Sequence, residues 1–376
     1  MTLGLLGEPS TLDPYASDAS ALTYTLARPL LPSLFRLLPD GTTEPYLAES
    51  LDETADGVLV TLREASWSDG HPITSEDVVA SWRRAMAPSG LARLDGAEAV
   101  DDRTVLLSGT FPDWERVLAT GAFVLPEGRF RRNISGGPLM VSRYRPGLRL
   151  DYEPNEAFFG RLAQLDGVTA FFYEDLSVLL EDLEEGELDA GAPPSTVNLV
   201  ERLELAGLEH SSALGSEQIG LLGLSVGRDV LRGTALAIDL DASYETFIED
   251  HGRRLPLLPG QAPARVTLAS PRGDELLSLL ARAAHFQARD EGVTVEPAEV
   301  EARFLYGEDP EALQGLDVAL VRHIDVPGHR PARPYLALFE VETYLAWHPG
   351  VAGLQPNPTL EGPLWNAEEW SLTGEG

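Results

Sequence analysis

The chain has 376 residues, of which 43% are hydrophobic and 23% are charged, and these proportions are those of a soluble globular protein with two or three cores. Its 60 acidic residues outnumber 28 basic ones, and the formal net charge of -32 creates a field that repels nucleic acid. The sequence contains no lysine, so all its basic side chains other than histidine are arginines. It also contains no cysteine, which excludes disulfide bonds, thiolate metal sites and cysteine nucleophiles.

The first 134 residues are predicted to alternate short strands with helices. The initial apolar run stops at a Gly7-Glu8-Pro9 turn, and apolar residues then recur with helical spacing despite two prolines. Thr74 and Asp77 form a near capping box, which starts a helix. The elements predicted here are strands at 3–6, 58–62 and 100–107, and helices at 21–36, 75–86 and 113–119.

The remaining residues are predicted to form α/β units. A hairpin turning at Pro146-Gly147 follows a glycine-rich passage, and strands then alternate with helices. The expected strands are 139–144, 148–152, 168–173, 188–190, 265–269, 293–295 and 318–322. The expected helices are 176–185, 230–238, 244–250 and 274–291. Residues 351–354 and 365–372 are expected to return to the first lobe.

Four passages, taken in order, resemble the family 5 extracellular solute-binding proteins, which include the oligopeptide and dipeptide receptors of bacterial ABC importers. The most specific is residues 67–82 (WSDGHPITSEDVVASW), which is similar to the family's most recognisable signature. The others are 7–14 (GEPSTLDP), the passage from 135–139 (SGGPL) through 153–155 (EPN) to 158–160 (FFG), and 347–358 (WHPGVAGLQPNP). The resemblance therefore reaches from one end of the chain to the other.

The resemblance is weakest between about 185 and 340, where 232–239 (RGTALAID) still matches a family helix. Family members usually run longer, so the second lobe is expected to be abbreviated. A family passage of the form GW-x-x-D-x-x-DP corresponds to 322–328 (RHIDVPG), which keeps the first Asp as Asp325 and has Arg322 in place of Trp.

The resemblance implies an α/β protein of the periplasmic-binding-protein type II fold, with two lobes, an inserted α+β subdomain and a ligand cleft. Lobe I would comprise 1–28, 135–227 and 342–376, and lobe II would comprise 228–341. The inserted subdomain would be 29–134. Two strands crossing between the lobes would act as a hinge, so that the lobes close on a solute.

The resemblance also implies a ligand site. Asp325 matches the Asp that holds the ligand's ammonium group, and Arg322 and His323 lie beside it. Asp18, Ala19 and Ser20 match backbone that pairs with an extended ligand, as an added strand would. Gly136 and Gly137 belong to the glycine-rich passage. For each of these groups a purely structural role, such as a loop that caps its own backbone, remains the alternative.

The function implied is the substrate-binding component of an ABC importer, which captures peptides and acts with permease subunits at the membrane. The protein would be a monomer outside the cytoplasm, a membrane-anchored lipoprotein in full-length form, although MTLGLLG is no export signal. The alternative is a cytoplasmic ligand-sensing domain of a regulator.

No catalytic motif is present, so no enzyme activity and no cofactor are expected. His323, His329 and His348 lack the spacing of a metal site, and Trp67 and Trp82 are expected in the core rather than at a sugar platform.

Overall fold

A computed structural model describes residues 1–16, 19–85, 95–110, 113–238, 240–248, 252–261, 263–301, 304–305, 313–324 and 333–372. The helices are α1 (Ala21–Ala27), α2 (Ser75–Ala85), α3 (Trp114–Gly121), α4 (Leu176–Glu184), α5 (Leu199–Leu205), α6 (Arg228–Ala237), α7 (Leu240–Phe247) and α8 (Glu275–Gln287). None of the helices in these ranges is long and apolar enough to cross a membrane.

A long mixed sheet forms the body of the molecule. Its strands follow the order β15-β14-β16-β12-β17-β11-β1-β10-β9-β8, with β13 paired to β17. Their bounds are β1 (Thr2–Leu6), β8 (Leu139–Arg145), β9 (Arg149–Pro154), β10 (Val168–Tyr173), β11 (Ala190–Ala192), β12 (Glu209–Gly223), β13 (Gly252–Arg254), β14 (Arg265–Pro271), β15 (Thr294–Val300), β16 (Val318–Ile324) and β17 (Tyr335–Trp347).

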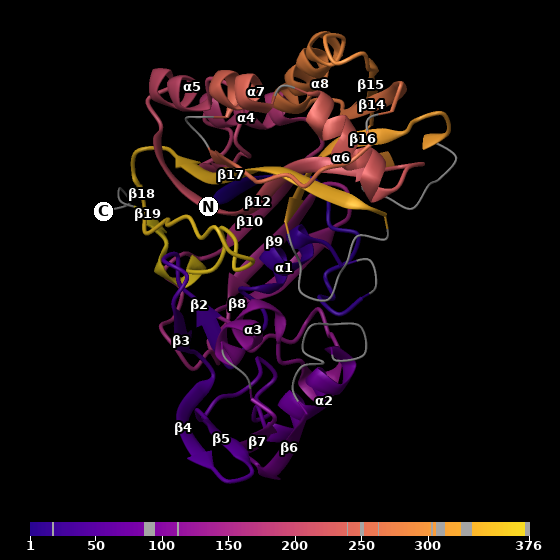
Figure 1. Ribbon diagram of the computed structural model, residues 1–376. Helices are drawn as coiled ribbons and strands as arrows, with labels where there is room; N and C mark the ends of the chain where they lie inside the picture. The colour runs from indigo at the N-terminus through magenta and orange to yellow at the C-terminus, as the bar shows by residue number, and fades with distance from the viewer. Residues whose placement is uncertain are drawn as a thin grey trace.

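Smaller sheets lie away from this body. A four-stranded sheet of order β4-β5-β7-β6 occupies the far end of the molecule with α2 beside it (Figure 1). Its strands are β4 (Ala48–Thr54), β5 (Gly57–Leu62), β6 (Gly96–Asp101) and β7 (Thr104–Ser108). The remaining two-stranded pairs are β2 (Phe35–Leu37) with β3 (Thr43–Pro45), and β18 (Val351–Ala352) with β19 (Ser371–Leu372).

Separate hydrophobic cores define the parts of the protein that are named below. Lobe I is the part built on β1, β8, β9, β10 and β11, with one core on each face of the sheet. Lobe II is built on β14, β15 and β16 with helices α6 and α8, and the inserted subdomain has a core of its own between Leu34 and Ile134. The α/β class is confirmed.

The strands β12 and β17 belong to both lobes. Tyr344 and Ala346 of β17 are buried in lobe I, whereas Leu338, Phe339 and Val341 of the same strand are buried in lobe II. The two strands pair antiparallel along most of their length, with a register shift between Leu214 and Gln218. They are therefore the connection through which the lobes are joined.

Two predicted elements are wrong. The helix expected over 21–36 ends at Ala27, with Arg28 as its C-cap, because Pro29 lacks the N–H donor that would continue the helical hydrogen bonds. Residues 100–107, expected to be one strand, instead include the end of β6, a turn at Asp102-Arg103 and most of β7, which pair as a hairpin. The predicted hairpin of β8 and β9 and helices α2, α4 and α8 are confirmed within a few residues.

Candidate functional site

The ends of parallel strands from the two lobes meet at one place. In lobe I, β1 runs parallel to β10 and β11, and in lobe II, β14 runs parallel to β15 and β16. Open α/β sheets bind their ligands beyond the carboxyl ends of such strands. Asp175 follows β10 and Gly273 follows β14, and a Cβ atom at Gly273 would lie 3.2 Å from the Asp175 carboxyl carbon. The candidate site is therefore this junction between the lobes.

Arg322 lies at the junction, where it donates to three groups of the described part of the chain. Its Nε donates to Asp274 Oδ2 at 2.6 Å, its Nη1 to Glu217 Oε1 at 2.8 Å, and its Nη2 to the Ser195 carbonyl at 2.6 Å. The Arg322 side chain is 11% exposed, and the side chains of Glu217 and Asp274 are 9% and 8% exposed. Such a cluster exists only because each charge has a close opposite charge.

The charged groups of this cluster shift one another's pKa values. Burial alone lowers the pKa of Arg322, but Asp274 and Glu217 raise it well above the usual range, so the guanidinium stays charged. Burial raises the pKa of Glu217, and Arg322 offsets part of that rise. Within the described residues, two carboxylates thus face one guanidinium.

Arg322 was expected to offer its guanidinium to a ligand carboxylate or carbonyl. The structure places it at the junction, as expected, but its Nε and both Nη atoms already donate to protein groups. The neighbouring His323 stacks on Tyr335 with ring centroids 4.7 Å apart. Asp325, like Asp18 and His329, lies outside the described residues.

The other predicted site residues have packing and capping roles. Ser20 caps α1, accepting from the Thr23 N–H, while its own N–H donates to Thr23 Oγ1. Ala19 is buried, and its N–H donates to the Ala16 carbonyl. These N–H groups are thus not available for strand addition, because local turn and capping bonds already use them.

Gly136 and Gly137 pack where lobe I meets the inserted subdomain. Both N–H groups donate to the Leu30 carbonyl at 3.0 Å. A Cβ atom would lie 2.3 Å from the Pro29 carbonyl oxygen at Gly137, and 2.8 Å from the Trp67 ring at Gly136. Close approach of the backbone explains both glycines, and the structure gives them no open surface for a ligand.

Sequence reasoning missed the residues that surround Arg322. Asp274 could be inferred from its place between a strand and a helix, where it caps α8 by accepting from the Leu277 N–H. Glu217 and Ser195 have no comparable signal, because β12 was not predicted and the loop after β11 is irregular. Among the described residues, no group of three or more His, Asp and Glu side chains could hold a metal ion.

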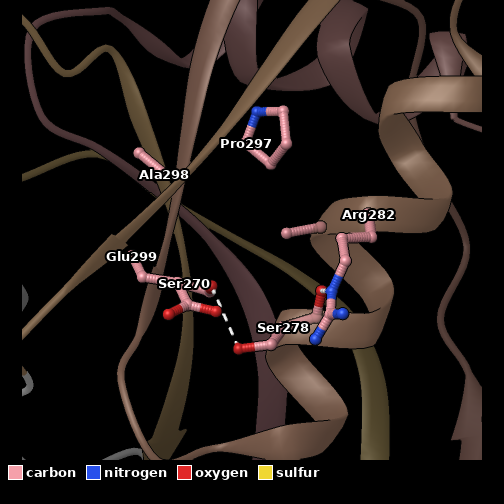
Figure 2. Close-up of a pocket in the computed structure, with 7 residues that line it drawn as sticks. Ser270, Ser278, Arg282, Pro297, Ala298 and Glu299 are labelled. Carbon is pink, nitrogen blue, oxygen red and sulfur yellow. Dashed lines mark hydrogen bonds between the residues drawn. The ribbon is translucent and has the colours of Figure 1, made fainter.

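A pocket of about 260 Å³ lies within lobe II (Figure 2). Its lining comes from β14, α8 and β15, and Figure 2 shows the Ser270 and Ser278 hydroxyls facing each other, 3.5 Å apart. Arg282 and Glu299 add one charge of each sign. The pocket is lined by lobe II alone, and none of the predicted site residues lines it.

The comparisons with known proteins agree on one family. Residues 42–222 match the model of the bacterial extracellular solute-binding proteins, family 5 (middle region). The periplasmic oligopeptide-binding protein OppA of Haemophilus influenzae is 33% identical over 88 residues, which are 23% of this chain and 16% of that protein. The chain therefore matches well under two thirds of this curated relative's length.

Solved structures resemble the whole chain. The oligopeptide-binding protein AppA of Bacillus subtilis, in complex with a nonapeptide, has a TM-score of 0.80 at 15% identity, covering 100% of this chain and 99% of that one. NikZ of Campylobacter jejuni, in complex with Ni(L-His), also has a TM-score of 0.80, at 14% identity, and 99% of each chain is covered. At these identities the likeness shows the fold, and it confirms the periplasmic-binding-protein type II architecture expected from the sequence.

Proposed function

Because the chain belongs to the bacterial extracellular solute-binding proteins of family 5, we propose that it captures a small solute between lobe I and lobe II and delivers it to an ABC importer. The observation that carries this proposal is the junction itself. There the carboxyl ends of two sets of parallel strands face each other, while β12 and β17 connect the lobes. Peptides are the first choice of solute, and Ni(L-His) bound by NikZ marks metal chelates as the competing class.

Capture would need no covalent chemistry. The lobes rotate about β12 and β17, and the solute stabilises the closed form only as far as it binds that form better than the open one. Micromolar affinity corresponds to about -8 kcal/mol, which a cleft supplies by burying apolar area and adding a few fixed polar contacts. The closed monomer is then what permease subunits recognise outside the cytoplasm.

The class of solute is tested by native mass spectrometry of freshly purified protein. A co-purifying ladder of peptide masses supports the peptide proposal. A single non-peptide mass contradicts it and leaves solute binding itself intact.

Lobe closure is tested by small-angle X-ray scattering with the solute so identified. We expect a smaller radius of gyration in the complex, because rigid-body closure brings the two lobes together. An unchanged radius across a binding transition confirmed by calorimetry contradicts the hinge mechanism.

We further propose that Asp325, directly after β16, anchors a cationic group of the solute. Removing one partner of a buried charge pair costs about 3–5 kcal/mol, or roughly two to four decades of affinity, whereas a solvated loop carboxylate contributes almost nothing. Asp325→Asn is therefore expected to weaken binding by at least a hundredfold in calorimetry, with an unchanged thermal melt. Affinity within threefold of the original would reduce Asp325 to a loop cap.

A further inference from the structure

The contacts of Arg322 join the two lobes. Ser195 lies in the loop between β11 and α5 of lobe I, whereas Arg322 and Asp274 belong to β16 and the start of α8 in lobe II. Glu217 comes from β12, which both lobes share. One buried guanidinium therefore connects lobe I, lobe II and the strand between them.

Apolar contacts beside Arg322 cross the same junction. Val197, two residues after Ser195, packs against the core of lobe II. Ile324, two residues after Arg322, packs against the core of lobe I. The side chain of Asp175 approaches Gly273 closely at the same place. The structure thus has the lobes in contact, with Arg322 between these apolar and polar contacts.

Two hydroxyl groups oppose this arrangement. Ser195 Oγ and Thr196 Oγ1 are buried, and among the described residues neither has a hydrogen-bond partner. Buried polar groups without partners disfavour the state that buries them, and separation of the lobes would return these two to water. The contacts of Arg322 and the unsatisfied hydroxyls of Ser195 and Thr196 therefore act in opposite directions on the equilibrium between lobes in contact and lobes apart.

We infer that Arg322 is the positioning residue that favours contact between the lobes before solute arrives, acting through the Ser195 carbonyl and Asp274, and that it thereby raises solute affinity. The inference rests on the proposed function only for its second part. A solute that binds closed lobes gains affinity in proportion to how populated the closed state already is.

The first test measures the distance between the lobes without any solute. Because the chain has no cysteine, Leu205→Cys on α5 and Phe286→Cys on α8, both largely exposed, can carry nitroxide spin labels for double electron–electron resonance. Without solute, the labelled protein is expected to show a short distance from lobes in contact and a longer one from separated lobes. Arg322→Gln should reduce the short-distance population, and Arg322→Lys should give an intermediate result because an ammonium group lacks the planar fork.

Two further variants keep the test decisive. Arg282→Gln on α8 is the matched control, since the hydrogen bond of its Nε in the described part of the chain goes to its own helix, at the Ser278 carbonyl. Asp274→Asn keeps an oxygen that can cap α8 and removes the charge facing Arg322, so it serves if Arg322→Gln does not fold. Identical distance distributions for folded Arg322→Gln or Asp274→Asn and for Arg282→Gln overturn the inference.

The second test uses tri-alanine and tri-lysine as probes in calorimetry. At least one should bind the original protein, and Arg322→Gln should bind it at least tenfold more weakly, while Arg282→Gln binds it unchanged. Equal affinity of Arg322→Gln and the original overturns the second part of the inference. Absence of binding by every variant counts against the peptide proposal, and the distances between labels still decide the role of Arg322.

Discussion

Asp77 connects the parts of the sequence signature at 67–82, and its removal should destabilise the inserted subdomain. Its Oδ2 accepts from the Thr74 N–H at 2.9 Å and from the Trp67 indole N–H at 3.3 Å. Its Oδ1 accepts from the Glu127 N–H at 2.7 Å, where Glu127 has a positive φ of 52°. The carboxylate thus starts α2 and fixes a turn fifty residues away.

Asp77→Ala would leave these three donors without their acceptor. The Trp67 bond is buried, whereas the Thr74 and Glu127 bonds are partly buried. A buried donor left unpaired costs about 1–3 kcal/mol and a partly buried one costs less, and the losses are not fully additive because the donors share one acceptor, so we expect about 3–5 kcal/mol in total. That is a large part of the 5–15 kcal/mol that stabilises a typical domain.

Hydrogen exchange followed by mass spectrometry, together with calorimetry, measures this effect. Peptides from α2 and around Glu127 should exchange faster by roughly two to four orders of magnitude, and those from lobe II should not change. Glu76→Ala, at the exposed neighbouring position in α2, is the control and should cost less than about 1 kcal/mol. Equal exchange in the two variants would refute this account of the signature.

Two other expectations follow from packing and burial. Gly137→Ala should lower the melting temperature sharply, because its Cβ atom would meet the Pro29 backbone. Gly96→Ala is the control and should be nearly neutral, because nothing lies within 4 Å of a Cβ atom there. Equal melting temperatures of the two variants would contradict the packing role of Gly137. Burial raises the pKa of Glu361 to about 7, although Arg28 lies 2.6 Å away and opposes the rise. The folded state therefore holds this proton above the ordinary carboxyl pKa of 4.5, and the corresponding stability is full below about pH 4.5 and is lost as the pH rises through 7. Denaturant unfolding from pH 4.5 to 8 should show this fall in the original protein and a flatter profile in Glu361→Gln, and parallel profiles would exclude Glu361 as its source.

The sequence by itself determined the local elements whose signals are short-range. Helix α2 could be placed from the Thr74 and Asp77 capping box, and the β8–β9 hairpin from alternating apolar residues around Pro146-Gly147. The family resemblance rested on the same kind of evidence, because the signature at 67–82 is a local arrangement that Asp77 stabilises. Apart from the bond between Asp77 and the Glu127 N–H, these features rest on contacts between residues close in sequence.

Only the tertiary structure decided which residues join the lobes. The family resemblance implied two strands crossing between the lobes, but their positions at β12 and β17 were not predicted, because each strand packs against different cores along its length and shows no single alternating pattern. Likewise, Arg322 was predicted to face the ligand. In the fold it is surrounded by groups distant in sequence, which are Asp274, Glu217 and the Ser195 carbonyl. A charge removed from water takes the partners that the fold brings within reach, and those partners cannot be read from its own neighbours in the chain.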